Sequence, residues 1–251
     1  EEKARGLTID LGFAYTEHLG FVDVPGHQKF IHNMVAGVAA DQHALLVIAA
    51  DDGPMPQTQE HLEILSLIGV TQGTVALSKC DLVSPERLSA CNREISELTR
   101  NTFLQEASIF QTSAEDTTCY ADLSDHLLQQ AANHRGNHDT TCFRLAIDRA
   151  FIIKGAGVVA TGTVHSGEVQ EGQQVYHFPS GKVLRVRSVR VEDQPAARSA
   201  RGDRCALNLV GASLEDIKRG DWITAQPTRG VRSMTIRLDK ASSFNRPLQH
   251  W

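Results

Sequence analysis

Hydrophobic residues in the first half of the chain form short unbroken runs that alternate with longer amphipathic segments. The apolar runs at 19–24, 44–50, 74–77 and 108–110 are typical of buried strands. Between them, residues 57–68 repeat hydrophobic positions at helical spacing and are followed by Gly69, a residue that commonly ends helices. Ser84 and Pro85 fit the N-cap and first turn of another helix. This alternation predicts a doubly wound, mostly parallel sheet with helices on both faces.

The second half changes to short β-branched runs separated by glycine-containing turns. These runs lie at 143–147, 158–164, 174–178, 183–186, 205–210 and 222–225, and they predict an all-β barrel or sandwich. Lys182, Arg185 and Arg187 alternate with apolar residues, and the alternation breaks at Ser188, where we expect a β-bulge. Such a row of basic residues more commonly just faces solvent, and contact with RNA is the alternative.

The pattern divides the chain into four parts. An α/β domain is predicted over 1–131, a polar linker without periodicity over 132–141, and the barrel over 142–227. Residues 228–251 read as the start of a third β domain, with a strand at 233–238.

Composition narrows the class of protein. With 251 residues, 41% hydrophobic and 22% charged, the chain is typical of a globular protein of two modest domains. No apolar run approaches the roughly 20 residues that span a bilayer, and no secretion signal is present, so we expect a cytoplasmic protein without membrane contact. The five cysteines show no C-x-x-C spacing, which favours reduced thiols. The net charge of −5 restricts any RNA contact to a local basic patch.

Polar residues follow several of the predicted strands of the first half. Asp23, Asp51, the 79–81 segment and the 113–114 segment each come after an apolar run. Ligands on doubly wound sheets bind beyond the carboxyl ends of the strands. We therefore expect these residues to form one ligand site.

The segment Asp23-Val24-Pro25-Gly26-His27 suits the phosphate end of a nucleoside triphosphate. Asp23 can hold Mg²⁺ or one of its water ligands. Gly26 lets a backbone N–H approach a phosphate oxygen, because it has no Cβ. His27 follows directly and can orient an attacking water.

Two further segments suit guanine. Ser78-Lys79-Cys80-Asp81 resembles the N-K-x-D element of GTPases, in which a carboxylate accepts the ring N–H and the amino group of guanine and a lysine stem covers the base. Ser113-Ala114 resembles the S-A element, whose backbone N–H meets the guanine carbonyl. Ser78 stands where many GTPases have asparagine, so we expect weaker bracing of the loops and unchanged guanine preference through Asp81.

The chained motifs resemble the bacterial selenocysteine-specific elongation factors over essentially the whole chain. The matching stretches are 1–13, the D-V-P-G-H element, 143–172 and 217–225. The resemblance implies a GTP hydrolase that uses GTP, GDP and Mg²⁺, with Thr8 as a switch ligand of the metal beside Asp23. It also implies a monomer that carries selenocysteinyl-tRNA to the ribosome at recoded UGA codons.

In that family a pocket of the barrel receives the selenocysteinyl group. The matching residues here are Asp148, Arg149 and Arg204. A selenol is ionised at neutral pH, so paired arginines can favour it over neutral serine. The alternative interpretation is a local salt bridge between Asp148 and Arg149.

Two family elements do not occur in the sequence. No G-x-x-x-x-G-K-[ST] phosphate loop precedes the Arg5–Asp10 element, so we expect an α/β domain that is incomplete at its N-terminus. We expect these 251 residues alone to bind GTP weakly and to be inactive, although the full-length parent is a GTP hydrolase. The C-terminal region that binds the messenger hairpin in this family is also missing.

Two other functions stay open at this point. One is a general carrier of aminoacyl-tRNA of the elongation factor Tu type, which shares the switch, the D-x-P-G-H element and the barrel. The other is a non-catalytic binding protein derived from a GTPase, if the phosphate loop is truly absent.

Overall fold

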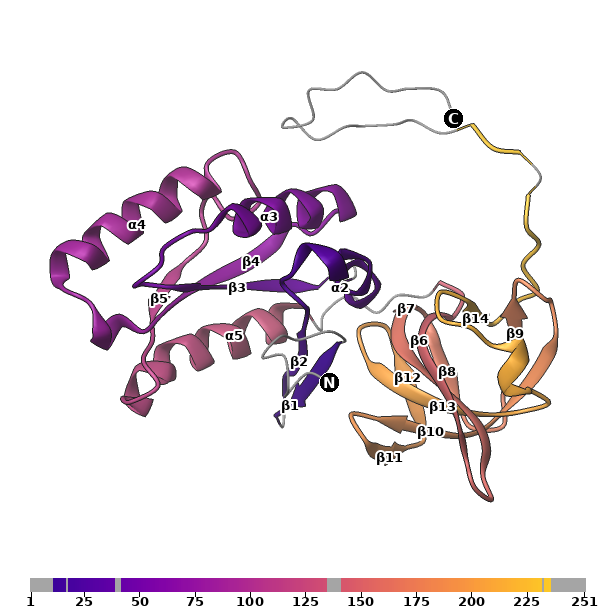
Figure 1. The fold of residues 1–251 in the computed structure, drawn as a ribbon. Coiled ribbons are helices and arrows are strands. Elements are labelled where there is room, and N and C mark those ends of the chain that lie inside the picture. Colours follow the sequence, from indigo (N-terminus) through magenta and orange to yellow (C-terminus); the bar gives the residue numbers. More distant parts are fainter. Residues whose placement is uncertain (1–10, 17, 39–41, 135–140, 232, 236–251) are drawn as a thin grey trace.

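Two kinds of sheet divide the chain, a parallel one in the first half and an antiparallel one in the second (Figure 1). The computed structural model describes residues 11–16, 18–38, 42–134, 141–231 and 233–235. Thr8, the predicted metal ligand, lies outside these residues, as does most of the predicted strand at 233–238. Residues 233–235, which are the described part of this predicted strand, do not form a strand.

The parallel sheet has three strands in the order β3 (His43–Ala49), β4 (Gln72–Ser78) and β5 (Ile109–Gln111). Helices α3 (Pro56–Ile68) and α4 (Pro85–Thr99) lie over one face, and α5 (Tyr120–His134) lies over the other (Figure 1). Leu62 of α3 and Ile95 of α4 pack in one core cluster with the sheet, whereas Leu123 of α5 packs against Ala76 from the opposite side. The predicted doubly wound α/β arrangement is therefore confirmed.

Local sequence explains where the helices begin and end. The Ser84 hydroxyl accepts a hydrogen bond from the Arg87 backbone N–H at 3.3 Å, as an N-cap does. Gly69 ends α3 in the left-handed conformation, with φ of 98°. Helix α5 continues through residues 132–134, which were predicted as the start of the linker, because Ala131 and Ala132 are strong helix formers.

A two-stranded antiparallel hairpin precedes the parallel sheet. It consists of β1 (Gly12–Tyr15) and β2 (Gly20–Asp23), and the 3₁₀ turn η1 (Gln28–Phe30) and helix α2 (Ile31–Gly37) follow it. The sequence predicted β2 and missed β1. The four residues of β1 are too few to show a clear alternation of apolar and polar positions. Gly12 lies opposite Asp23 in the hairpin.

The second half forms a closed barrel. Its sheet order is β11-β10-β13-β7-β6-β14-β9, and β9 also pairs with β10, which closes the ring. The strands are β6 (Arg144–Ile153), β7 (Gly157–Ser166), β9 (Gln174–Phe178), β10 (Val183–Val191), β11 (Gln194–Ala196), β13 (Arg204–Val210) and β14 (Trp222–Thr224). A separate pair joins β8 (Glu168–Gln170) and β12 (Arg198–Ala200). Inward residues of the barrel strands other than β11 form one hydrophobic core, as the predicted barrel requires.

Two strands of the barrel contain β-bulges. In β10 the register shifts between Val186 and Ser188, which confirms the predicted bulge at Ser188. In β6 it shifts between Ile147 and Arg149, so that Asp148 occupies the irregular position. A bulge changes the direction of the side chains that follow it.

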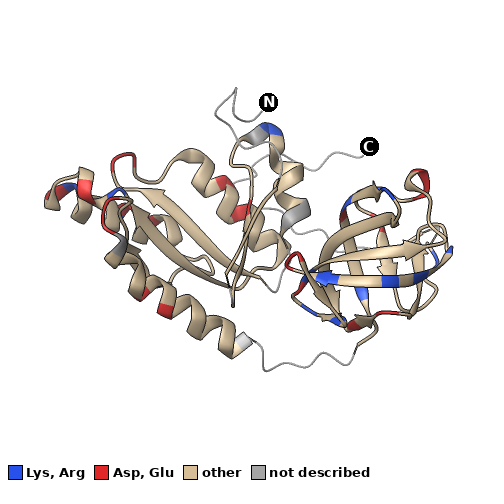
Figure 2. Cartoon of the chain, turned by 90° about the horizontal axis from the view of Figure 1, so that it is seen from below, with Lys and Arg blue, Asp and Glu red and all other residues tan. Residues whose placement is uncertain are grey.

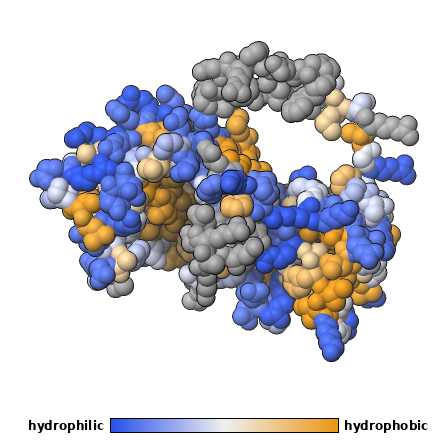
Figure 3. All heavy atoms as spheres, viewed as in Figure 1, coloured by the Kyte–Doolittle hydropathy of each residue, from blue (hydrophilic) through white to orange (hydrophobic). Residues whose placement is uncertain are grey.

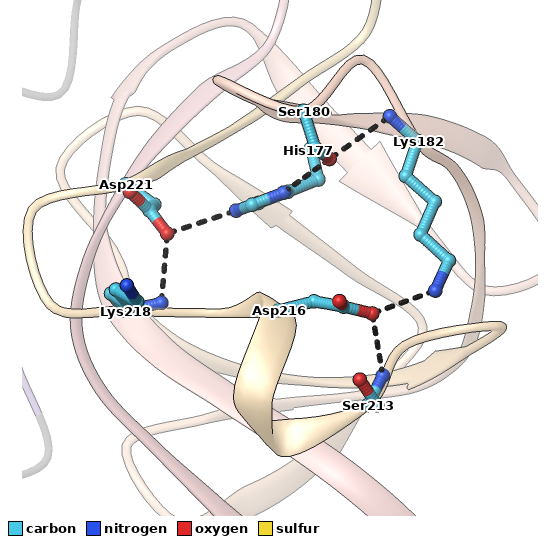
Figure 4. A network of polar contacts seen from close by, with 7 residues as sticks. All are labelled: His177, Ser180, Lys182, Ser213, Asp216, Lys218 and Asp221. Atoms are coloured by element: carbon cyan, nitrogen blue, oxygen red, sulfur yellow. Dashed lines mark hydrogen bonds and ion pairs between the residues drawn. The ribbon is translucent and has the colours of Figure 1, made fainter.

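One end of the barrel is held by a network of buried and exposed polar residues (Figure 4). His177 is 2% exposed, with Nδ1 at 2.7 Å from the Ser180 hydroxyl and Nε2 at 3.0 Å from Asp221 Oδ2. Asp221 also accepts the backbone N–H of Lys218 at 2.7 Å. The order serine–histidine–aspartate is that of a hydrolase triad, but the burial of the imidazole leaves no room for a substrate. The network joins the β9–β10 turn to the loop before β14.

No helix among the described residues is both long enough and apolar enough to cross a membrane.

Candidate functional site

The carboxyl ends of the parallel strands bring the predicted guanine segments together. In the register of the sheet, Ala49 lies beside Ser78 and Leu77 beside Gln111, so the segments after all three strands emerge at one edge. The Cys80 backbone N–H donates to the Thr112 carbonyl at 3.2 Å. The loop with Asp81 and the loop with Ser113 are therefore hydrogen-bonded neighbours.

Lys79 has a left-handed backbone and an ion pair that was not predicted from the sequence. Its backbone is left-handed, with φ of 57°, and its Nζ lies 2.7 Å from Asp51 Oδ2. The hydrogen bond with Lys79 lowers the pKa of the Asp51 carboxyl and raises the pKa of the Lys79 ammonium. Asp51 thus fixes the lysine stem that is predicted to cover the base. The position of Asp51 after a buried strand was the only signal of this role in the sequence.

The serines of the two predicted guanine segments are both used in local bracing. The Ser78 hydroxyl donates to the Ile48 carbonyl of the neighbouring strand at 3.3 Å. The buried Ser113 donates its backbone N–H to Cys119 Sγ at 3.1 Å, and its hydroxyl accepts the Glu115 N–H. Ala114 and Asp81 stay exposed beside these braced positions, so the Asp81 carboxylate is accessible to a base.

The Asp23–His27 segment lies at the end of the hairpin. Asp23 is exposed, and a Cβ at Gly12 opposite it would lie only 3.2 Å from the Asp23 Cβ. Gly26 is exposed and faces His61 of α3, which a Cβ at position 26 would approach to 3.5 Å. His27 Nδ1 accepts the Lys29 backbone N–H at 3.2 Å, which leaves Nε2 as its outward nitrogen.

The residues predicted to bind the selenocysteinyl group are Asp148, Arg149 and Arg204. They lie on the outside of the barrel and are called the cargo cluster below. Arg204 of β13 donates from Nη1 and Nη2 to the two carboxylate oxygens of Asp148, the second at 3.3 Å. Thr161 Oγ1 donates to the same carboxylate at 2.7 Å. The Asp148 and Arg204 side chains are only 10% and 14% exposed. The structure therefore gives Asp148 a long-range partner from another strand, and Arg149 follows it directly along the bulged strand.

The β1–β2 hairpin covers this cluster with two aromatic residues. The guanidinium carbon of Arg204 lies 3.5 Å from the ring centroid of Phe13, a close cation–π contact. Burial raises the pKa of the Tyr15 hydroxyl, and its hydrogen bond with Arg204 acts in the opposite direction. Phe13 and Tyr15 were not predicted as site residues. Their alternate spacing in β1, directly after the switch element, is the signal that could have found them.

A doubly wound domain with a guanine-type edge, joined to a closed β-barrel, defines the class of translational GTPases. The sequence matches the family described as elongation factor Tu GTP binding domain over residues 1–133, and elongation factor Tu domain 2 over residues 157–224. The chain belongs to the elongation factor Tu GTP-binding domain family.

Within this family the chain is homologous to the selenocysteine-specific elongation factors. It is 44% identical to the selenocysteine-specific elongation factor of Escherichia coli (strain K12), over all of this chain and 41% of that protein. A crystal structure of a bacterial selenocysteine-specific elongation factor, EF-Sec, matches with a TM-score of 0.83 and 33% identity over 89% of this chain and 39% of the other. Translation elongation factor SelB from Methanococcus maripaludis, in complex with the GTP analogue GppNHp, matches with a TM-score of 0.77 and 31% identity, over 88% and 50%. The chain thus spans about two fifths of the length of the bacterial relatives.

Proposed function

We propose that this protein is a selenocysteine-specific translation elongation factor, a GTP hydrolase that delivers selenocysteinyl-tRNA to the ribosome at recoded UGA codons. The observation that carries this function is the Arg204 guanidinium, paired with Asp148 and covered by Phe13. This function also requires contacts with the ribosome and, through a region outside these 251 residues, with a messenger hairpin. It places the protein in the cytoplasm, where we expect a monomer.

The cargo cluster has the chemistry to select a selenolate. Arg204 uses Nη1 and Nη2 on Asp148 and also hydrogen-bonds with Tyr15, and its other N–H donors can meet an anion. Arg149 adds a second positive charge next to Asp148 along β6. A selenolate gains a charge-assisted hydrogen bond from these donors, whereas the neutral hydroxyl of serine gains a weaker one.

The guanine edge has the chemistry to select GTP and GDP. The exposed Asp81 carboxylate can accept both N–H groups on one side of guanine, and the Lys79 stem, held by Asp51, can cover the base plane. Ala114 offers its backbone N–H to the guanine carbonyl from the adjacent loop, Ser113 braces that loop through Cys119, and Ser78 is hydrogen-bonded to the neighbouring strand β3. Adenine lacks the matching donors for the Asp81 carboxylate.

The hairpin end has the chemistry of the phosphate site. Asp23 supplies an exposed carboxylate, an oxygen ligand of the kind that Mg²⁺ prefers, and Thr8 would supply a hydroxyl. When bound, Mg²⁺ neutralises charge on the phosphates. Gly26 offers its backbone N–H to the terminal phosphate, and the outward nitrogen of His27 orients the attacking water.

Cargo selection is tested by comparing affinities for selenocysteinyl-tRNA and seryl-tRNA in the full-length gene product. We expect a clear preference for selenocysteinyl-tRNA, which Arg204→Met removes. Arg198→Met is the matched control, because Arg198 is exposed and pairs with Glu168 elsewhere on the barrel. Equal affinities in the unmodified protein would contradict the proposed cargo and favour a general carrier of aminoacyl-tRNA.

Hydrolysis is tested with His27→Ala in the full-length gene product. GTP binding should be retained, and ribosome-stimulated hydrolysis should fall by about 100-fold or more, the usual effect of losing a group that orients and activates water. Hydrolysis at the unmodified rate would remove His27 from the mechanism.

A further inference from the structure

Strand β10 presents a row of three arginines to solvent. Arg185, Arg187 and Arg190 are exposed, while the apolar residues between them, Leu184, Val186 and Val189, are at most 2% exposed and belong to the barrel core. Figure 2 shows basic positions recurring along the strands of the barrel. The row is therefore a surface feature of a strand whose other face is fixed by packing.

The bulge in β10 keeps the third arginine on the outer face. Arg187 and Arg190 are three positions apart, so strict alternation would turn one of them into the core. The register shift between Val186 and Ser188 adds one residue, which buries Val189 and returns Arg190 to the outside. The fold thus gathers three cations on one face.

None of these three arginines has a carboxylate partner among the described residues. Arg187 donates to the Ala156 carbonyl at 3.4 Å, and Arg190 donates to the Asp193 carbonyl. The Arg185 side chain makes no hydrogen bond or ion pair with any described residue. The flanking strands β9 and β13 contain no aspartate or glutamate.

Two other exposed cations of the barrel have carboxylate partners. Lys182 Nζ lies 2.7 Å from Asp216, and Arg198 lies 3.5 Å from Glu168. Strand β10 thus places three arginines without a carboxylate partner in one row, in a chain with a net charge of −5.

We propose that the outer face of β10 binds the phosphate backbone of the carried tRNA. Alternate residues of a strand are about 6.6 Å apart, and each arginine fork can hold one phosphate through two hydrogen bonds. The face has a single aromatic neighbour, Tyr176, whose hydroxyl already accepts the Gln174 amide, so it suits the backbone better than stacked bases.

The position of the arginine row relative to Arg204 indicates which RNA the face binds. Arg190 lies opposite Ala206 on β13, two residues beyond Arg204 of the cargo cluster. RNA attached to a group held at Arg204 can therefore continue along β10. The assignment to tRNA rests on the proposed function, whereas the binding of an RNA backbone rests on the arginines alone.

The test uses the 251-residue chain and a fluorescently labelled, uncharged tRNA transcript, with Kd measured by anisotropy over a range of salt concentrations. The variant is Arg185→Glu with Arg187→Glu. The matched control is Arg198→Glu with Arg219→Glu, which makes the same charge change at residues outside β10. Circular dichroism melts are used to check that both variants are folded.

The β10 variant is expected to bind the transcript about ten-fold more weakly at low salt, and its log–log salt slope is expected to fall by about 1.5–2, because two phosphate contacts are lost. The control is expected to stay within about two-fold of the unmodified chain. A folded β10 variant with unchanged Kd and slope overturns the proposal, and so does an equal loss in the control. Binding to polyglutamate but not to the transcript also overturns it, because the partner is then an acidic protein.

These outcomes are separate from those of the cargo test. Loss of transcript binding in the β10 variant, together with equal affinity for selenocysteinyl- and seryl-tRNA in the full-length gene product, would remove the proposed cargo and leave the RNA face. If the cargo preference is preserved and the β10 variant binds the transcript as the unmodified chain does, the RNA face is removed and the proposed cargo stays.

Discussion

The barrel and the α/β domain build their candidate sites in different ways. In the barrel, the Asp148–Arg204 pair is 10% and 14% exposed, and Thr161 and Phe13 hold it from two sides. In the α/β domain, the Asp51–Lys79 pair is 39% and 46% exposed and lies at the open edge of a three-stranded sheet. A pocket that distinguishes one side chain gains from preorganisation, whereas a site that changes with its nucleotide needs loops that can rearrange.

Exposed hydrophobic residues do not distinguish the two domains. Figure 3 shows hydrophobic residues on the surface of both, with a continuous patch on the barrel in this view. Exposed apolar residues of the barrel include Ile152, Ile153 and Val210. Those of the α/β domain include Val47, Leu67 and Leu82.

The largest expected effect is that of Asp148→Ala. It leaves the Arg204 guanidinium largely buried without its carboxylate, so we expect the free energy of unfolding to fall by about 3–5 kcal/mol. Urea denaturation followed by circular dichroism measures this. Asp51→Ala is the matched change in the α/β domain, and because its ion pair is exposed we expect no measurable loss. Similar losses in both variants would contradict the difference between the two sites.

The next effect concerns the buried imidazole at the end of the barrel. His177→Ala removes hydrogen bonds to Ser180 and Asp221 and leaves a cavity, so a loss of about 2–3 kcal/mol is expected in the same denaturation assay. Lys182→Ala, which breaks an exposed pair in the same network, serves as the control and should unfold at nearly the unmodified urea concentration. An equally small effect of both would mean that the network does not brace the barrel.

A smaller effect is expected in helix α4. Ser84→Ala removes the N-cap and should lower the free energy of unfolding by about 1 kcal/mol. Ser96→Ala is a control within the same helix, because the Ser96 hydroxyl only donates to the Asn92 carbonyl one turn earlier. If the two serine variants unfold alike, the cap does not contribute to the stability of the α/β domain.

The smallest effect is the pH dependence of the Lys182–Asp216 pair. The hydrogen bond from Lys182 lowers the pKa of Asp216 from 3.8 to about 2. A depressed carboxyl pKa stabilises the folded state above the unfolded pKa, and this contribution is lost as the pH falls through the folded pKa. The Tm difference between the unmodified chain and Lys182→Ala should therefore be small at about pH 5 and vanish near pH 2. A difference that persisted at the lower pH would assign it to lost packing of the lysine stem.

Features set by neighbouring residues were predictable from the sequence. The end of α3 at Gly69, the Ser84 cap and the β10 bulge all follow from local residue preferences, and the structure has each of them. The alternation of strands and helices likewise predicted the parallel sheet, and the short β-branched runs predicted the barrel.

Features set by distant residues were not predictable in this way. Nothing in the spacing of the chain indicates that Asp148 would meet Arg204, or that Phe13 would lie against that guanidinium. Strand β10 was predicted to end at residue 186, because Arg187-Ser188 interrupts its alternation, yet it continues to Val191 beyond the bulge. The functional roles assigned to the site residues stay predictions until the variants are measured.

The bulge in β10 has a consequence for how this surface can change. The bulge absorbs one extra residue, so that Arg190 points outward although it lies three positions after Arg187. Deleting Ser188 should remove the bulge and leave Val189 inside and Arg190 outside, because regular alternation from Arg187 then gives the same faces. The charge that this face of the barrel presents should therefore survive the loss of the bulge residue, whereas straightening the strand with Ser188 in place would exchange the faces of Val189 and Arg190.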